Sequence, residues 1–394
     1  MNIYSEPDLI DPLELRVTYN KIRSRTVEIC SPLSTEDYVP QPALFTSPPK
    51  WHLAHTTWFF EEMILKKLKL DYKVYDNSFG FLFNSYYNSI GERTARHQRG
   101  LITRPTVDQV YQFRAYIDSQ MADLFDGIDN KELKELVTLG LNHEQQHQEL
   151  LLTDLKYSLS QNPLYPVYSE KVNYINQRNK DSGWIDLDEG IYEVGHQGQS
   201  FCFDNEHGRH KTYIQNVQIN KSLVTNGEFI EFIESGGYNN FRFWLDEGWS
   251  WVNESKAKAP MYWKKVDSAW HHFTLNGLQP IANESIIAHV NYYEAAAFAT
   301  WKGMRLPTEF EWEAASPKIK WGQRWEWTNS AYLPYPGFKI AEGAVGEYNS
   351  KFMINQMVLR GASIATAEGH SRQTYRNFFH PQYQWQFTGI RLAR

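Results

Sequence analysis

Two histidines, His143 and His147, are separated by four positions within a long stretch of helical periodicity. Residues at i and i+4 lie on one face of an α-helix about one turn apart, so the two imidazoles could bind one metal ion. A third histidine, His55, lies upstream in another predicted helix. Three neutral imidazoles would leave about half of an octahedral shell open for substrate and O2, which suits Fe(II) chemistry, although three histidines also bind zinc. The pattern predicts a metal site without choosing the metal.

The same segment, HEQQH, also satisfies the H-E-x-x-H pattern of zinc hydrolases, in which Glu144 would be the general base. Hydrolases of that type have a third ligand downstream of the pair, whereas His55 lies upstream. His52 is three residues from His55 and is the rival for the third position. Gly140, three residues before His143, would leave room beside the metal. The spacing alone leaves the third ligand and the metal open.

Four segments with helical periodicity must position these histidines. Apolar residues recur every three or four positions over residues 12–28, 49–64, 106–124 and 131–159. Four such helices joined by loops are typical of a helical bundle. His55 belongs to the second predicted helix, and the other two histidines belong to the fourth. We therefore expect these two helices to turn their histidines toward the interior of the bundle.

The rest of the chain follows a different pattern. Residues 162–181 combine prolines, tyrosines and mixed charges, which predicts a linker. From Trp184 onward, short runs are bounded by Gly, Asn and Pro, with one helix expected over residues 290–301, and this predicts an irregular α+β fold. We therefore predict an α domain followed by an α+β domain, with limits at residues 1–162, a linker at 163–182, and 183–394.

The composition disfavours several classes of function. The chain has 394 residues and a formal net charge of −6 without a basic stripe, which disfavours a nucleic-acid surface. Its two cysteines, Cys30 and Cys202, are too few for a disulfide framework and lack CxxC spacing. The first residues contain no apolar signal core, and no apolar run is long enough to cross a bilayer. We expect a cytoplasmic protein without a membrane or nucleic-acid partner, and the oligomeric state stays open.

The residues around the histidines resemble a known family. The segment PPKWHLAHTTWFFE and the run HEQQHQE resemble the metal-binding helices of the DinB-type four-helix bundle in ergothioneine-pathway sulfoxide synthases. The C-terminal half resembles the formylglycine-generating-enzyme fold, an irregular C-type-lectin-like domain. The segments that carry this second resemblance are HVNYYEAAAFATWKGMRLPTEFEWEAA, WEWTNSAYLPYPGF, VLRGAS and TYRNFFHPQYQWQFTGIRLAR. Together the two resemblances span nearly the whole chain in the same domain order.

This resemblance implies roles for individual residues. It implies three iron ligands, His55, His143 and His147. The W-x-L-A-H motif ends at the ligand position of the family, which favours His55 over His52. Gln146 matches a position that contacts the imidazole substrate. Asn377 matches a position near a quaternary ammonium group, and the aromatic face of Phe378 would cradle that cation.

The chain departs from one branch of the family at two positions. That branch has an aspartate where this chain has Phe379, and it has a catalytic tyrosine about where this chain has Val345. This chain instead carries Tyr86 and Tyr87, which resemble a tyrosine pair in the bundle domain of a second branch. Either tyrosine could supply a proton as the C–S bond and the sulfoxide form, although interface packing would also explain the pair.

The loop after these tyrosines contains a pair of arginines with family-like spacing. Arg96 and Arg99 match the R-x-x-R carboxylate clamp of the family, which implies bidentate hydrogen bonds to the carboxylate of the sulfur substrate. A solvated basic loop is the simpler interpretation for most of the arginines in this segment.

The resemblance implies a sulfoxide synthase that uses Fe(II) and O2 to join hercynine (N-alpha-trimethylhistidine) to cysteine, giving hercynylcysteine S-oxide in ergothioneine biosynthesis. Alternative substrates within this class are gamma-glutamylcysteine, unmethylated histidine as in ovothiol synthesis, and a selenosugar. Other classes are a DinB-type zinc hydrolase or thiol transferase and a non-catalytic binding module. Formylglycine-generating enzymes bind copper through paired cysteines, and residues 361–379 contain no cysteine, so that activity is not expected.

Overall fold

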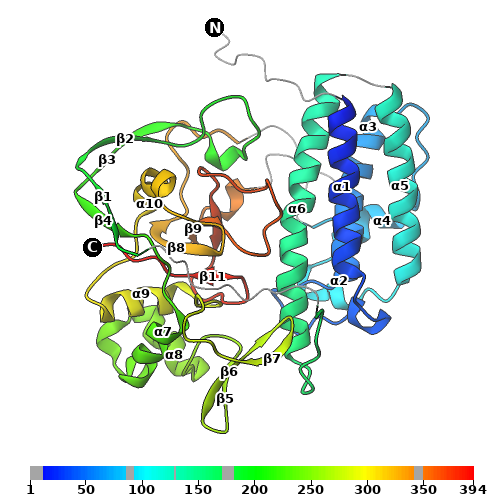
Figure 1. Cartoon of the computed structure of the whole chain (residues 1–394). Coiled ribbons are helices and arrows are strands. Elements are labelled where there is room, and N and C mark those ends of the chain that lie inside the picture. The colour runs from blue at the N-terminus through cyan, green and yellow to red at the C-terminus, as the bar shows by residue number, and fades with distance from the viewer. Residues whose placement is uncertain (1–11, 86–92, 128–129, 171–181, 341–348) are drawn as a thin grey trace. The chain divides into compact units, whose positions relative to one another are not determined.

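The computed structural model describes residues 12–85, 93–127, 130–170, 182–340 and 349–394 (Figure 1). These residues form two compact units. The first comprises the described chain up to Pro163 with the short segment Gly198–Phe201, and the second comprises the other described residues. The first unit is helical and the second contains both helices and sheets, which confirms the predicted fold class.

Four long helices make up most of the first unit. They are α1 (Pro12–Cys30), α2 (Pro49–Phe60), α5 (Val107–Gly127) and α6 (Lys131–Ser160), which run side by side in Figure 1. Proline occupies the first position of α2, where its missing N–H costs nothing. Asn130 caps α6 by accepting a hydrogen bond from the backbone N–H of Leu133 at 2.8 Å. The four predicted helices are confirmed, with ends a few residues from those expected.

Shorter elements connect the long helices. After α2 the chain continues as a π-helical turn, Glu61–Leu65, and then as α3 (Lys66–Leu68). The helix α4 (Asn77–Leu82) was not predicted, because six residues are too few to establish a helical period; Asp76 caps it by accepting a hydrogen bond from Ser78 N at 2.8 Å. Two 3-10 helices complete the unit, at Thr35–Tyr38 and Arg96–Leu101.

Helix α2 is the most enclosed element of the first unit. All of its residues, Pro49–Phe60, are buried, and it packs against both α5 and α6. A helix at a protein surface usually keeps one polar face, so burial on every side means that neighbouring elements surround α2 completely. Its polar side chains, which include His52 and His55, must therefore find partners inside the protein.

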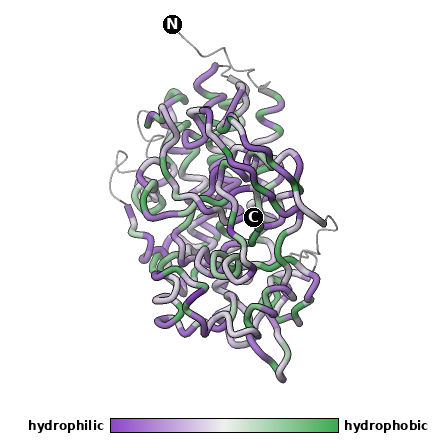
Figure 2. Tube along the Cα trace, turned by 90° about the vertical axis from the view of Figure 1, so that its left-hand side faces the viewer, coloured by the Kyte–Doolittle hydropathy of each residue, from purple (hydrophilic) through white to green (hydrophobic). Residues whose placement is uncertain are grey.

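Hydropathy changes over short distances along the chain. In Figure 2 hydrophilic and hydrophobic residues alternate along the described trace. Among the described residues, no helix combines the length and the apolar character that crossing a membrane requires.

The second unit contains several small sheets. Antiparallel pairs join β1 (Trp184–Leu187) to β4 (Val217–Asn220) and β2 (Gly190–Val194) to β3 (His210–Ile214). A three-stranded antiparallel sheet contains β5 (Trp263–Val266), β6 (Ala269–Thr274) and β7 (Gly277–Pro280). A four-stranded sheet has the order β10 (Asn377–Phe379), β9 (Met357–Ala362), β8 (Arg324–Ala331) and β11 (Thr388–Gly389), with β11 parallel to β8.

Three of the four α-helices that the structure describes in the second unit begin at a capping side chain. The four are α7 (Asn226–Glu234), α8 (Asp246–Ser255), α9 (Tyr292–Trp301) and α10 (Glu309–Ala315). Thr225, Asn291 and Thr308 form capping boxes at the starts of α7, α9 and α10. Only α9 was predicted, over residues 290–301. Short 3-10 helices lie at Asp204–Glu206, Gly237–Asn239, Phe241–Phe243, Ser316–Lys318 and Ser350–Phe352.

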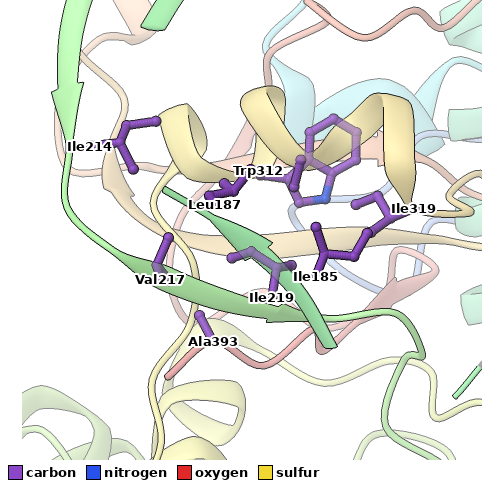
Figure 3. Packing of buried hydrophobic residues seen from close by; sticks show 9 residues of the cluster. Ile185, Leu187, Ile214, Val217, Ile219, Trp312, Ile319 and Ala393 are labelled. Carbon is purple, nitrogen blue, oxygen red and sulfur yellow. The ribbon is translucent and has the colours of Figure 1, made fainter. Parts of the chain in front are cut away.

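A hydrophobic cluster beside α10 forms part of the core of the second unit (Figure 3). Its buried members are Ile185, Leu187, Ile214, Val217, Ile219, Trp312, Ala315, Ile319 and Ala393. The indole N–H of Trp312 donates to Glu326 of β8 at 2.6 Å, and Arg391 pairs with the same carboxylate at 2.6 Å. Apolar packing and a buried ion pair therefore hold the C-terminal segment against α10 and β8.

Candidate metal centre

Three buried histidines of the first unit come together between α2 and α6. One ring nitrogen from each of His55, His143 and His147 lies within 4.8 Å of the other two, and no other such group occurs in the part of the chain that the structure describes. His55 lies on α2, and the other two lie one turn apart on α6. Their ring centroids are 4.6–4.9 Å apart. This arrangement can hold one metal ion by three imidazoles.

The protonation states of these histidines fit metal binding. Burial lowers the pKa of His143 to about 3, and burial with the neighbouring imidazoles lowers the pKa of His55 and His147 well below the usual range. All three rings are therefore neutral at pH 7 and offer lone pairs. Nδ1 of His55 lies 2.7 Å from the carbonyl oxygen of Phe83, which can only accept, so Nδ1 carries the proton. Nε2 of His55 is buried, and no described residue hydrogen-bonds to it, so this nitrogen could bind a metal ion.

His52, the rival third ligand, is not part of the converging group. Its Nδ1 lies 2.9 Å from Nδ1 of His147, and its Nε2 lies 3.1 Å from Oδ2 of Asp154. Both nitrogens are thus occupied by partners within the protein. The three-residue offset from His55 turns His52 toward the next turn of α6, beside His147 rather than into the centre of the group.

Glu144 faces away from the histidines. Its Oε1 accepts hydrogen bonds from Thr26 at 2.6 Å and from Arg114, and its Oε2 accepts one from Arg23 at 3.0 Å. Burial by itself would raise the pKa of Glu144, but the two arginines outweigh burial and lower that pKa to about 2. A carboxylate that is fully engaged and this weakly basic is unsuited to take a proton from water. The geometry therefore argues against Glu144 as the base of a zinc hydrolase.

Aromatic rings enclose the histidines, and the sequence interpretation did not identify them. Trp51 stacks on His55 with ring centroids 4.4 Å apart, and Trp58 stacks on it at 5.5 Å. Phe59 lies 5.0 Å from the ring of His143. The signal was present in the sequence, because Trp51 and Trp58 lie four residues before and three residues after His55 and so share its face of the helix.

Gly140 has a different role from the one predicted. A Cβ atom at this position would lie 2.8 Å from the ring of Phe59 and 2.9 Å from the ring of Phe60. Both rings belong to α2, so the missing side chain permits close packing of α2 against α6 instead of leaving space beside the metal. The prediction for Gly140 was wrong because the adjacent phenylalanines of α2 occupy that space.

The two arginines of the predicted carboxylate clamp differ in burial, because one is buried and the other is exposed. Arg99 is 5% exposed, and its two terminal nitrogens donate to Ser47 at 2.9 Å and to Ser85 at 2.8 Å. Its guanidinium lies 3.4 Å from the ring centroid of Trp51, which itself stacks on His55. Arg96 is exposed. Of the two arginines, Arg99 is therefore the one linked to the histidine group, through its contact with Trp51.

The other predicted site residues lie in different places. Gln146 is half-buried on α6 directly before His147. Tyr86 and Tyr87 lie outside the described residues, as does Val345. Asn377 and Phe378 belong to β10 in the second unit. The ring of Phe378 stacks on Tyr332 with centroids 4.1 Å apart and on Phe352 with centroids 5.9 Å apart, so neighbouring rings already contact its aromatic surface.

Comparison with known proteins first identifies the two domain families that the chain matches. Residues 18–151 match the DinB superfamily, and residues 171–324 match the sulfatase-modifying factor enzyme 1-like domain. These matches confirm the predicted order of a DinB-type helical domain followed by a domain related to formylglycine-generating enzymes.

Comparison with individual proteins indicates the kind of enzyme more specifically than the domain families do. The chain is 29% identical to the hercynine oxygenase of Mycolicibacterium smegmatis over 71% of this chain and 77% of that protein. It is 28% identical to the hercynine oxygenase of Mycobacterium tuberculosis over 64% of this chain and 70% of the relative. The ergothioneine biosynthesis protein 1 of Schizosaccharomyces pombe is 23% identical over 49% of this chain and 28% of its own length. The chain is therefore an oxidoreductase similar to the hercynine oxygenases.

Proposed function

We propose that this protein is an Fe(II)- and O2-dependent sulfoxide synthase that joins hercynine to cysteine and forms hercynylcysteine S-oxide for ergothioneine biosynthesis. The observation that carries the proposal is the converging group of three buried, neutral imidazoles, His55, His143 and His147. The similarity to two hercynine oxygenases supports the choice of substrates and reaction.

The proposed reaction balances without an external reductant. The imidazole C–H and the cysteine S–H are replaced by one C–S bond, which supplies two electrons. Oxidation of that sulfur to the sulfoxide supplies two more. One oxygen atom of O2 ends in the sulfoxide, and the other leaves as water with the two hydrogens. An Fe(II) ion held by the three histidines would supply the redox chemistry that activates O2.

The residues of the chain would bind and orient the substrates. Arg99 is our candidate for the carboxylate of cysteine, because its terminal nitrogens now donate to serine hydroxyls that a carboxylate could replace. Arg96 would contribute from the exposed part of the same loop. Gln146 would contact the imidazole, and Tyr86 or Tyr87 would donate a proton during C–S bond formation.

Two residues of the second unit are candidates for contacts to the quaternary ammonium group. They are Asn377 and Phe378, and the stacking of Phe378 on Tyr332 and Phe352 would hold that ring in a fixed orientation. Free cysteine is the preferred sulfur substrate in this proposal. Gamma-glutamylcysteine, histidine and a selenosugar remain the alternatives to be tested.

Oxygen consumption with defined substrate pairs tests the proposal. The metal-free protein would be loaded with Fe(II) under anaerobic conditions and mixed with O2 and one imidazole–sulfur pair at a time. We expect the fastest O2 uptake and a sulfoxide product of the correct mass with hercynine and cysteine. Substituting Tyr86 and Tyr87 singly by Phe would show which tyrosine donates the proton, because loss of that donor should divert turnover toward oxidation of the thiol alone. If no imidazole–sulfur pair consumes O2, the proposed function is wrong.

A further inference from the structure

A line of buried hydrogen bonds leads from the start of α2 to one of the three converging histidines. The backbone N–H of Ser47 donates to Oδ2 of Asp154 at 2.8 Å. The same oxygen lies 3.1 Å from Nε2 of His52, and Nδ1 of His52 lies 2.9 Å from Nδ1 of His147. Asp154 and His52 are 1% and 2% exposed, so water does not compete for these contacts. We call Asp154 and His52 the relay pair.

The chemistry of the donors and acceptors fixes the direction of each bond. A carboxylate oxygen only accepts, so Nε2 of His52 must carry the proton that points at Asp154. A neutral imidazole carries a single proton, so the other nitrogen of His52, Nδ1, has only a lone pair and can only accept. Nδ1 of His147 must then be the donor between the two rings. His147 is left with an unprotonated Nε2.

We propose that His52 and Asp154 are positioning residues that hold His147 in the tautomer required for metal binding. They present Nε2 of His147 as a lone pair and fix the plane of its ring. The inference rests on the proposed three-histidine metal site and is independent of which substrates the enzyme uses. A ligand histidine generally donates its second N–H to a carboxylate or a carbonyl oxygen, as His55 does to Phe83. His147 differs because its acceptor is another imidazole, whose own tautomer depends on Asp154.

The packing of the helices explains why the relay pair lies at this place. Asp154 follows His147 by seven residues and lies on the same face of α6, two turns further along. His52 precedes His55 by three residues on α2, one turn away in the direction of Asp154. The relay pair is therefore a further, polar contact between the two helices that carry the three histidines. Through Ser47 it also fastens the chain directly before α2.

Two measurements on the full-length protein test the inference. Long-range 1H–15N correlation spectra of the metal-free wild type would report the tautomer of His147, and we expect the proton on Nδ1. Anaerobic titration with Co(II) or Fe(II) would give the dissociation constant. For His52→Phe, which keeps a ring but removes both nitrogens, we expect metal binding to weaken about 10–100-fold. For His52→Asn, which retains an acceptor oxygen near the position of Nδ1, we expect a smaller loss.

A matched control separates the relay from a general effect on folding. His370 is another buried histidine, at 1% exposed, and it belongs to the second unit. His370→Phe should leave metal affinity unchanged. A proton on Nε2 of His147 in the metal-free wild type would overturn the inference, as would wild-type metal affinity in a folded His52→Phe variant. Failure of the wild type to bind either metal would instead refute the three-histidine site, and the tautomer would still decide whether the relay exists.

Discussion

Replacing Glu144 by glutamine distinguishes a structural carboxylate from a catalytic base. Glu144 is fully buried and bonded to Arg23, Arg114 and Thr26. In Glu144→Gln, Arg23 keeps Asp118 as a partner at 2.7 Å. Among the described residues, Arg114 keeps only hydroxyl and carbonyl oxygens as acceptors. The substitution therefore leaves one buried guanidinium without a counter-charge.

The expected loss of stability is several kcal/mol. Folding lowers the pKa of Glu144 from 4.5 to about 2, and a change of one in pKa corresponds to about 1.4 kcal/mol, so the ionised carboxylate contributes roughly 3 kcal/mol at neutral pH. Removing one member of a buried ion pair costs about 3–5 kcal/mol, in agreement with that value. For a domain of this size, such a loss lowers the Tm by roughly 6–20 °C.

The stability that Glu144 contributes should change with pH in a defined direction. A carboxyl group whose pKa is lowered by folding contributes stability that is fully present above its unfolded pKa and is lost as the pH falls through its folded pKa. The contribution of Glu144 should therefore disappear between about pH 4.5 and pH 2. The unfolding free energy of Glu144→Gln should lack this part of the pH dependence.

Thermal and urea unfolding followed by circular dichroism would measure the loss of stability. O2 uptake measured well below the Tm would report activity separately. The matched control is Glu135→Gln on the same helix, where an exposed pair with Lys131 at 3.7 Å should contribute less than about 0.5 kcal/mol. If Glu144→Gln were as stable as the control variant, the ion-pair reasoning would be wrong. Wild-type stability combined with loss of a hydrolytic activity would favour the zinc-hydrolase alternative.

Four further substitutions test the helical unit. His55→Ala should weaken Fe(II) or Co(II) binding by at least about 100-fold in an anaerobic titration, because it removes one of three ligands; unchanged affinity would refute the ligand assignment. Gly140→Ala should destabilise the protein by about 1–3 kcal/mol in urea unfolding, because its Cβ would lie 2.8 Å from an aromatic ring of α2. Arg99→Ala should raise the KM for cysteine about tenfold or more, whereas Arg96→Ala should have a smaller effect; a reversed order in steady-state kinetics would contradict the role of Arg99.

The long helices were predictable because each contains several turns of regular apolar spacing. The prediction over residues 131–159 corresponds to α6 at Lys131–Ser160. In contrast, α4, α7, α8 and α10 were not predicted, because with at most ten residues each a helical period is hard to distinguish from chance; α9, also of ten residues, was the exception. For three of the helices that were not predicted, the N-terminal caps Asp76, Thr225 and Thr308 were the available signals.

The choice between His52 and His55 could not be made from periodicity, for a physical reason. Periodicity reveals the orientation of a helix only when one face is polar and another is apolar. Every residue of α2 is buried, so no polar face shows how the helix is rotated about its axis. The partners of Glu144 were equally hidden, because Arg23 and Thr26 lie more than a hundred positions away in the sequence.

The distribution of charge around the three histidines bears on the kind of substrate that the site favours. The charge of Glu144 raises the pKa of His143, but burial lowers that pKa more strongly and the two arginines neutralise the carboxylate. The three imidazoles are therefore uncharged ligands, and a divalent metal held by them would keep its full charge, unlike a metal in a site with two histidines and one carboxylate. The guanidinium of Arg99 adds a further positive charge close to His55 through the ring of Trp51. An anionic substrate would compensate both charges. The thiolate and carboxylate of cysteine would meet this requirement better than the cationic side of hercynine, which supports the proposed pairing of the cysteine carboxylate with Arg99.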